Sequence, residues 1–478
     1  REYRIYPNGT TGSHFIGYIG SISASDQKRL DEEGALPLYE GARNIGKVGL
    51  ERSYEALLHG RPGHESLEIT AGGHAVRTLD LEAALPGHNL ELTVDLNLQR
   101  VTEAAMKGKT GAVIAIEPKT GAILAFASLP TYNPNLFPGG IDPDSWSELT
   151  QSEEKPLLNR AMRGIYPIGS TYKPFMALAG LESGATTIDY VLNDTGVFSI
   201  GKHRFRDMTG APKGPLSIRK SIAVSSDVYY YWLATQLGVD RIYEFMKPWG
   251  FGQKTGIDLV GEQTGILPNR QWKEQRFKEP WYVGDTPSIG VGQGYNAFTL
   301  LQLAHATATL ANGGVVMRPH LVNATIDPVT GQKTYVAREP VETIPLKRAN
   351  LDVVIAGMTD VTKTGTARSV FQGAPYSVAG KTGTAQVVTI AQEDKYDEKK
   401  LARRHHDHAL FIAFAPVKNP EIALAVLVEN GGFGAKAAAP VAREVIDYWL
   451  TGKNSLGLPP PSGHVLITET KKPSDRRR

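Results

Sequence analysis

Cysteine is absent from the 478 residues of this chain. That absence excludes thiol catalysis, disulfide bonds and Cys-ligated zinc, and it is compatible with an oxidising compartment managed without disulfides. The sequence also contains no apolar run near the roughly 18 residues that a membrane helix needs. The chain starts at Arg1, without Met and without a signal-peptide pattern. We therefore expect any targeting segment or anchor to have been removed ahead of position 1.

A strong charge of one sign is also missing. The chain has 52 basic and 49 acidic residues, a net charge of +3, which gives no support to nucleic-acid binding. A hydrophobic content of 41% and a charged content of 21% are typical of a globular protein. The length exceeds that of one typical domain, so we expect a main catalytic domain and at least one smaller unit.

Apolar runs predict an antiparallel sheet built from distant parts of the chain. Residues 112–116 and 122–127 are joined by a turn-rich link at 118–121, which predicts a hairpin, and a second pair lies at 410–415 and 422–428. Strands at both ends with helices between them predict an α+β sandwich, with helices on the faces of the sheet. Apolar residues recur at helical spacing in five segments: 96–106, 173–181, 217–237, 299–312 and 439–450.

The chain divides into three predicted regions. Residues 1–90 form a mixed N-terminal region with short strand-like pieces at 14–18 and 67–70. Residues 91–452 contain the predicted sheet and its helices. Residues 453–478 are Pro-rich and then basic, which predicts a disordered tail.

The first candidate site is Ser170 with Lys173. A Pro-Ile-Gly turn precedes Ser170 and an apolar helix follows it, so free backbone N–H groups and the helix dipole favour developing oxyanion charge there. Lys173 lies on the same helix face and, with a depressed pKa, can remove the serine proton. The same spacing occurs without this context, as expected for helix caps or solvated pairs, at three other places: Ser25/Lys28, Ser152/Lys155 and Ser217/Lys220.

The second candidate site is Ser225-Ser226-Asp227. These three polar residues interrupt the apolar helical pattern of 217–237. Such an interruption is costly unless the hydroxyls and the carboxylate have partners. The alternative interpretation is a cap at the end of a helix.

The third candidate site is Lys381-Thr382-Gly383-Thr384, in a strand-like run where a glycine lets a substrate backbone approach the edge. Lys363 begins a similar motif, but its flanks resemble the end of a helix. The three candidate motifs occur in order between 170 and 384, and the ordered set is far more specific than any one of them. Lys-Thr-Gly also occurs in other contexts, beginning at Lys109, Lys119 and Lys254.

On these motifs the chain resembles the class B penicillin-binding proteins, the monofunctional D,D-transpeptidases of peptidoglycan synthesis, over nearly its whole length. It is most similar to the elongation-type group, penicillin-binding protein 2. Asp227 is typical of that group, where division-type relatives usually have Asn, and the charged insert at 395–408 is also typical of it. Further matching stretches are 116–125, 159–161, 289–294 and 439–441.

The resemblance implies roles for the motif residues. Ser170 would attack the penultimate D-Ala carbonyl of a stem peptide and Lys173 would take its proton. The backbone N–H groups of Ser170 and Thr384 would form the oxyanion hole. Ser225 would relay a proton to the leaving D-Ala, and an amine of a neighbouring stem peptide would resolve the acyl-enzyme. Asp227 and Lys381 would hold that network, and the substrate carboxylate would contact Lys381, Thr382 and Thr384, beside Gly383.

The resemblance also implies partners and a location. β-Lactams would be trapped at Ser170, and no cofactor is expected. Residues 1–90 would be a pedestal that docks a polytopic SEDS-family glycosyltransferase and rod-shape scaffold proteins. The N-terminal region is too short to contain a glycosyltransferase domain itself. The expected location is the periplasmic face of the bacterial inner membrane, held by an anchor outside this chain.

Two clusters raise the question of a metal. Some elongation-type relatives bind a metal through a Cys in the second motif and an upstream His, but here Ser226 takes the Cys position and residues 207–214 contain no His. Asp194 and Asp207 alone make a poor zinc site, so we expect no structural zinc. His405-His406-Asp407-His408 lies beside the charged insert, and we expect a solvated loop there.

Three alternatives remain open. The chain is a β-lactamase or D,D-carboxypeptidase if water is the acceptor, but those chains usually lack such an N-terminal region, and no motif places a carboxylate to activate water. A division-type transpeptidase is a further alternative. A non-enzymatic scaffold that keeps the fold is disfavoured by the intact motif set.

Overall fold

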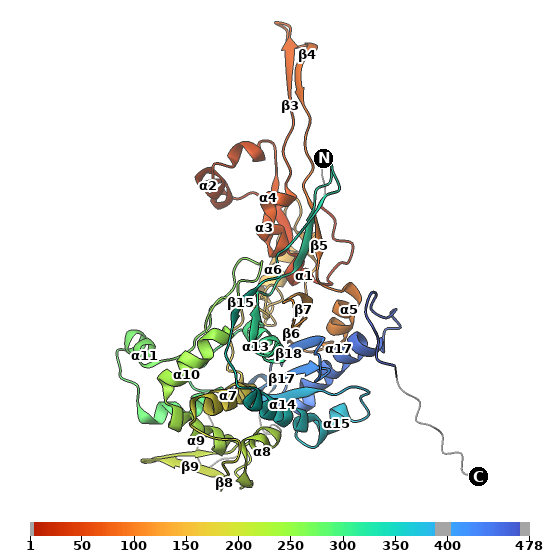
Figure 1. Cartoon of the computed structure of the whole chain (residues 1–478). Helices are drawn as coiled ribbons and strands as arrows, with labels where there is room; N and C mark the ends of the chain where they lie inside the picture. The colour runs from red at the N-terminus through yellow and green to blue at the C-terminus, as the bar shows by residue number, and fades with distance from the viewer. Residues whose placement is uncertain (1–3, 388–402, 469–478) are drawn as a thin grey trace, which may run out of the picture.

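The computed structural model describes residues 4–387 and 403–468 (Figure 1). Its centre is a five-stranded antiparallel sheet of order β16-β17-β18-β6-β7. Every residue of β6, β7 and β18 is buried, so both faces of the sheet are covered. The predicted α+β class and both predicted strand pairs are confirmed. The strands are β6 (Gly111–Ile116), β7 (Ile123–Leu129), β16 (Ala379–Ala385), β17 (His408–Ala415) and β18 (Ile422–Val428).

Helices supply the cover. α13 (Leu300–Ala311) packs across β17, β18 and β6, while α5 (Leu96–Ala105) and α17 (Ala439–Thr451) pack on each other and on the sheet. Asp95 caps the start of α5, because its side chain accepts a hydrogen bond from the Leu98 amide. Near β16, α14 (Arg348–Lys363) packs against α7 (Lys173–Ser183) and α8 (Ile218–Ala223).

The other helices and strands of the described residues lie outside this central sheet and its covering helices. The remaining α-helices are α1 (Ser13–Ile16), α2 (Ala24–Glu32), α3 (Gly49–Ser53), α4 (Glu55–Leu58), α6 (Pro143–Gln151), α9 (Asp227–Leu237), α10 (Val239–Met246), α11 (Arg270–Phe277), α12 (Thr286–Ile289), α15 (Arg368–Phe371) and α16 (Gly434–Ala437). The remaining strands are β1 (Tyr18–Ser21), β2 (Asn44–Val48), β3 (His64–Ile69), β4 (Ala75–Glu82), β5 (Asn89–Leu92), β8 (Leu192–Asp194), β9 (Val197–Ile200), β10 (His203–Arg206), β11 (Gly214–Leu216), β12 (Val315–Met317), β13 (Val322–Ile326), β14 (Lys333–Tyr335) and β15 (Pro340–Thr343).

The N-terminal region projects away from the sheet and ends in the exposed hairpin β3–β4 (Figure 1). The strand predicted at 67–70 is part of β3, but residues 14–18 form helix α1 and the start of β1, so that strand prediction is wrong. Gly12 and Gly17 both have positive φ and enclose a single helical turn, which period-two alternation does not reveal.

The N-terminal region packs tightly on the catalytic region. Tyr18 stacks on Phe137 with 3.6 Å between ring centroids, and the Tyr54 hydroxyl donates to Asp258 at 2.6 Å. β5 pairs with β13 in the three-stranded antiparallel sheet β14-β13-β5, so the predicted boundary at residue 90 falls inside a strand that joins the two regions. That boundary stays a prediction.

The helix predicted over 217–237 is broken. α8 ends at Ala223 and α9 begins at Asp227, and between them Ser225 has φ of +56°. A left-handed conformation costs an L-residue other than glycine about 1–2 kcal/mol, so neighbouring contacts must hold this loop. Apolar periodicity cannot reveal such a break, because both helices keep the same spacing on either side.

The C-terminal stretch turns back onto α17. Gly452 ends α17 in the left-handed conformation, the Tyr448 hydroxyl donates to the Pro459 carbonyl at 2.8 Å, and the Ile467 amide donates to the Leu450 carbonyl at 2.7 Å. These contacts differ from the disordered tail predicted from residue 453, whereas residues 469–478 lie outside the described part. None of the helices in the described ranges has the length and apolar character needed to cross a membrane.

Candidate active site

The Ser170 turn lies directly against β16. Ser170 is in a short 3-10 turn, Gly169–Tyr172, that leads into α7. Gly169 has φ of +56°, and a Cβ on it would lie 2.3 Å from the Thr384 carbonyl oxygen. A Cβ on Gly383 would lie 2.7 Å from Thr171 Cγ2. Both glycines therefore admit the close approach of the serine turn to the strand, a reason for Gly383 that the sequence did not reveal.

Lys173 is fully buried and contacts the second motif. Its Nζ donates to Asp227 Oδ1 at 2.6 Å, and to the Ser225 carbonyl and Ser225 Oγ at 3.1 Å each. Within residues 4–387 and 403–468, the Ser170 hydroxyl makes no hydrogen bond. Lys173 thus contacts both Ser225 and Asp227 directly. Ser170 makes no hydrogen bond to these side chains, and it lies near them because its turn leads directly into Lys173.

Lys381 reaches the same hydroxyl from β16. Its Nζ donates to Ser225 Oγ at 2.8 Å and to the Thr382 carbonyl at 2.9 Å, so the Ser225 hydroxyl lies between Lys173 and Lys381. Burial, and next the charge of Lys173, lower the pKa of Lys381 well below its usual range. A lysine with a lowered pKa gives up its proton more readily, so Lys381 is suited to proton exchange with the hydroxyl that it contacts.

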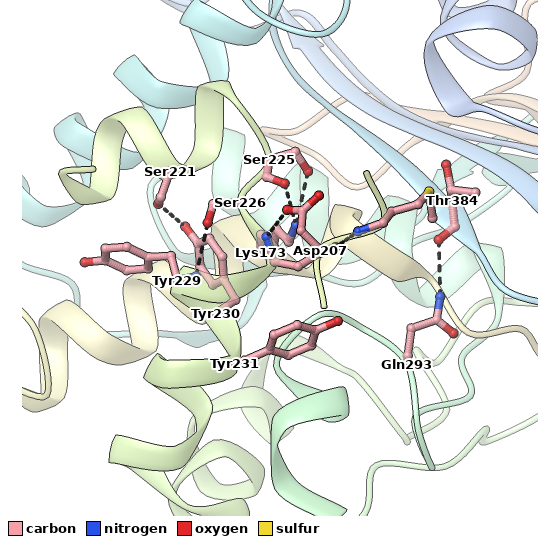
Figure 2. Close-up of polar contacts among 12 residues, drawn as sticks. Lys173, Asp207, Ser221, Ser225, Ser226, Tyr229, Tyr230, Tyr231, Gln293 and Thr384 are labelled. Atoms are coloured by element: carbon pink, nitrogen blue, oxygen red, sulfur yellow. Dashed lines mark hydrogen bonds and ion pairs between the residues drawn. The ribbon is translucent and has the colours of Figure 1, made fainter. Parts of the chain in front are cut away.

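β16 is an edge strand of the described sheet, because one of its sides pairs with β17 and no strand of the described residues pairs with the other. An extended peptide can add to such an edge through backbone hydrogen bonds. Two residues that the sequence analysis missed fix this strand: the Thr366 hydroxyl lies 2.8 Å from that of Thr382, and Gln293 Nε2 donates to the Thr384 carbonyl at 3.2 Å (Figure 2). Both stood in stretches already noted, the Lys363 copy of the third motif and 289–294.

Asp194 and Asp207 support the second motif. Asp194 Oδ2 accepts from the Ser226 hydroxyl at 2.6 Å, and Asp207 Oδ2 accepts from the Asp227 amide at 3.2 Å and pairs with the Lys213 ammonium. No group of three or more His, Asp or Glu side chains in the described residues is placed to hold a metal. The expectation of no structural zinc stays a prediction, which metal analysis of the purified protein can test.

The cluster at 405–408 is not the solvated loop that we expected. Asp407 is fully buried and its Oδ1 accepts from the Val387 amide at 3.1 Å. His408 begins β17, and its Nδ1 accepts from the Asn430 amide at 2.9 Å. The expectation is wrong for these two residues because the turn after β18 covers them. Residues 395–400 of the charged insert lie outside the described residues.

The other copies of the motifs have structural contexts. The Ser217 hydroxyl caps α8 by accepting from the Lys220 amide at 3.2 Å, as predicted. Lys363 is the last residue of α14, as its flanks predicted. Lys119 lies in the turn between β6 and β7.

Two family models match the chain. Residues 111–447 match the penicillin binding protein transpeptidase domain, and residues 1–92 match the penicillin-binding protein dimerisation domain. Among curated proteins, the peptidoglycan D,D-transpeptidase MrdA of Acinetobacter baumannii is 42% identical over 99% of this chain and 70% of its own length.

Solved structures agree with these matches. Pseudomonas aeruginosa PBP2 in complex with WCK 5153 has a TM-score of 0.80 and 40% identity, covering 93% of this chain and 91% of that one. PBP2 of Helicobacter pylori in its complex with MreC also has a TM-score of 0.80, with 31% identity, covering 92% of this chain and 77% of that one.

Proposed function

Because this chain belongs to the penicillin-binding protein transpeptidase family, and within it to the elongation-type PBP2 group, we propose specific roles for its motif residues in peptidoglycan D,D-transpeptidation. The reaction joins two stem peptides through an acyl-enzyme on serine. Ser170 is the proposed nucleophile. The observation that supports this assignment is the convergence of Lys173 and Lys381 on Ser225 beside the Ser170 turn, with Asp227 paired to Lys173.

In the acylation step, Ser170 Oγ forms a bond to the carbonyl carbon of the penultimate D-Ala while its proton passes to the Lys173 amine. This transfer requires the neutral form of Lys173, whose side chain also contacts Asp227. The oxyanion would be held by the backbone N–H groups of Ser170 and Thr384, two residues that the close approach of Gly169 to Thr384 brings near one another.

The tetrahedral intermediate breaks its C–N bond, and the leaving D-Ala nitrogen needs a proton. Ser225 is placed to supply it, because its oxygen already accepts from both lysines and its own hydrogen can donate elsewhere. Lys173 or Lys381 then returns a proton to Ser225. The amine of a second stem peptide attacks the ester, a new amide forms, and Ser170 regains its proton.

The donor peptide would add to the outer edge of β16. We expect Lys381 and the hydroxyl of Thr384, both on β16, to contact the terminal carboxylate of the donor. Thr382 already shares its hydroxyl hydrogen bond with Thr366, so its contact with substrate would need that pair to rearrange or to accept a second partner. Gly383 serves chiefly the approach of the serine turn.

The family also supports proposals on partners and location. The H. pylori relative forms a complex with MreC, and we propose that residues 1–90 of this chain dock a rod-shape scaffold protein of that kind. A SEDS-family glycosyltransferase is the proposed polymerase partner. The proposed location is the periplasmic face of the bacterial inner membrane, with β-lactams as covalent inhibitors at Ser170.

A fluorescent penicillin tests the assignment of Ser170. We expect a stable label on the wild-type chain that Ser170→Ala abolishes and that Ser217→Ala, a serine of the same spacing but in a helix cap, leaves intact. Loss of the label in Ser217→Ala with retention in Ser170→Ala would refute the assignment. Turnover of the label within seconds would indicate a β-lactamase, and no label at all would indicate a scaffold.

A further inference from the structure

The Ser225–Asp227 loop is held from outside the three motifs. Ser225 is in the left-handed conformation, and the two residues after it each depend on a buried carboxylate. Ser226 Oγ donates to Asp194 and the Asp227 amide donates to Asp207. Asp194 is fully buried and Asp207 is nearly so.

Each of these carboxylates is anchored in turn by its own segment. Asp194 Oδ1 accepts from the Gly196 amide at 2.7 Å, and Asp207 Oδ1 accepts from the Thr209 amide and hydroxyl at 3.1 and 3.0 Å. The Met208 amide donates to Asp227 Oδ2 at 3.3 Å. The segment 194–209 therefore makes hydrogen bonds both to the backbone of the loop and to its side chains.

Lys213 contacts both acidic residues, the side chain of Asp207 and the backbone of Asp194. Its ammonium pairs with Asp207, and its backbone amide donates to the Asp194 carbonyl at 3.1 Å. Asp207 accepts a hydrogen bond from the backbone amide of Asp227, and the Asp227 carboxylate pairs with Lys173. Asp207 is nearly fully buried and Asp227 is partly buried, so both carboxylates need positive charge beside them, which Lys213 supplies to Asp207 and Lys173 supplies to Asp227.

Electrostatics agrees with this geometry. Burial acts to raise the pKa of Asp207, but the Lys213 ammonium and, at longer range, Lys173 outweigh it and hold that pKa below its usual value. Lys213 also contributes to the lowered pKa of Lys381, after burial and Lys173. The charge of Lys213 thus acts on Lys381, which contacts Ser225, and on Asp207, which contacts the Asp227 amide.

We propose that Lys213 is a positioning residue for acylation: through Asp207 it fixes the backbone of Asp227, and with Asp194 and Ser226 it keeps the Ser225 hydroxyl between Lys173 and Lys381. This inference rests on the proposed transpeptidase function. Lys213 touches neither Ser170 nor the edge of β16, and it acts only through Asp207 and the loop.

The test is the acylation of Ser170 by a fluorescent penicillin in the full chain, with the limiting rate and the half-saturation concentration measured separately. Lys213→Met should lower the limiting rate about 10-fold or more with little change in half-saturation, as expected for a positioning defect. Lys213→Arg should stay within about 3-fold of wild type, because it keeps the charge. Lys202→Met, an exposed lysine of the neighbouring β9–β10 turn, should match wild type.

A second variant separates positioning from a general loss of stability. In Asp207→Asn/Lys213→Met the amide oxygen can still accept from the Asp227 amide, while the amide nitrogen takes the place of the oxygen that faces Thr209 and can donate to the Thr209 hydroxyl. The neutral side chain needs no cation, so acylation should recover in part relative to Lys213→Met. Equal rates for Lys213→Met and wild type would overturn the inference, as would a Lys213→Arg enzyme as slow as Lys213→Met, or no recovery in the double variant. Failure of wild type to label at Ser170 would instead refute the proposed function.

Discussion

At the scale of single residues, the chemistry centres on one hydroxyl. Ser225 Oγ lies 3.1 Å from Lys173 Nζ and 2.8 Å from Lys381 Nζ, and Asp227 holds Lys173 at 2.6 Å. Burial of Lys381 beside Lys173 lowers its pKa, which makes proton loss from this lysine easier although both lysines are fully buried. A change at Lys381 should therefore be far more damaging than a change at a lysine of the same local motif elsewhere.

Lys381→Met and Lys363→Met test that difference. Lys381→Met removes a buried donor to Ser225 and should lower the rate of acylation by a β-lactam on the order of 100-fold, the usual effect of losing one preorganised donor. Lys363→Met changes an exposed lysine at the end of α14 and should leave the rate within about 2-fold, since surface substitutions away from a site have small effects. Comparable rates for the two variants would contradict the account. The measurement is the second-order rate of penicillin labelling.

Much of the site could be predicted residue by residue from sequence, and the remainder could not. Ser170, Lys173 and Lys381 stand in motifs whose order marks them. Thr366 and Gln293 do not, because their contacts with Thr382 and Thr384 exist only after α14 and the glycine-rich 289–294 segment pack beside β16.

At the scale of elements, the site depends on how closely the serine turn approaches the edge strand. Gly169 is left-handed and its missing Cβ leaves room for the Thr384 carbonyl, while Gly383 leaves room for Thr171. Backbone approach of this kind fixes where the amides of Ser170 and Thr384 point. This close approach depends on the packing of the serine turn against β16, so it cannot be inferred from either element alone.

Gly169→Ala and Gly184→Ala separate backbone strain from this contact. Both glycines have positive φ, so each substitution should cost about 1–2 kcal/mol of stability. Only Gly169→Ala places a Cβ against β16, because nothing lies within 4 Å of the Gly184 position. We expect acylation to fall about 10-fold or more in Gly169→Ala alone, equal to roughly 1.4 kcal/mol of barrier. Thermal melts and labelling rates measured together decide it, and equal labelling rates would refute the contact.

Elements with buried apolar runs were predictable, and those set by backbone conformation were not. β18 has the predicted bounds, 422–428, because both of its faces are buried and every residue is apolar. The break between α8 and α9 was predicted only as an alternative, a helix-end cap at 225–227, and Ser226 does cap α9. Its conformation could not be predicted because it depends on the φ of Ser225 and on Asp194 and Asp207, which lie some twenty or more residues away in sequence.

At the scale of the whole molecule, the N-terminal region and the catalytic region are joined by buried polar contacts as well as by packing. Glu103 on α5 accepts from the Gly12 amide at 3.1 Å and from Gln99 at 3.2 Å. Burial raises the pKa of Glu103 to about 7, so its carboxyl is only partly ionised at neutral pH. These contacts, like those of residues 458–467 on α17, follow from tertiary packing and left no pattern in the sequence.

Glu103 predicts a pH dependence of stability. Its pKa is higher in the folded chain than the ordinary value of 4.5, so its favourable contribution is complete below about 4.5 and is lost as the pH rises through about 7. The full change is on the order of 3 kcal/mol. Glu103→Gln keeps the acceptor without the charge, and should melt at a higher temperature than wild type at pH 8 and at a similar temperature at pH 5.

The control is Glu148→Gln, an exposed carboxylate on α6. Its melting temperature should follow that of wild type at every pH between 5 and 8. A Glu103→Gln variant whose melting curve also follows wild type throughout would show that Glu103 ionises normally in the folded chain.

The most direct test of the account is the transfer of an acyl group between two peptides. A stem-peptide donor ending in D-Ala-D-Ala and an amine-bearing acceptor stem peptide are incubated with the chain, and products are identified by mass spectrometry. We predict release of D-Ala and formation of a new amide between the peptides, both abolished by Ser170→Ala. Hydrolysis of the donor without any new amide, or amide formation that survives Ser170→Ala, would contradict the central claim.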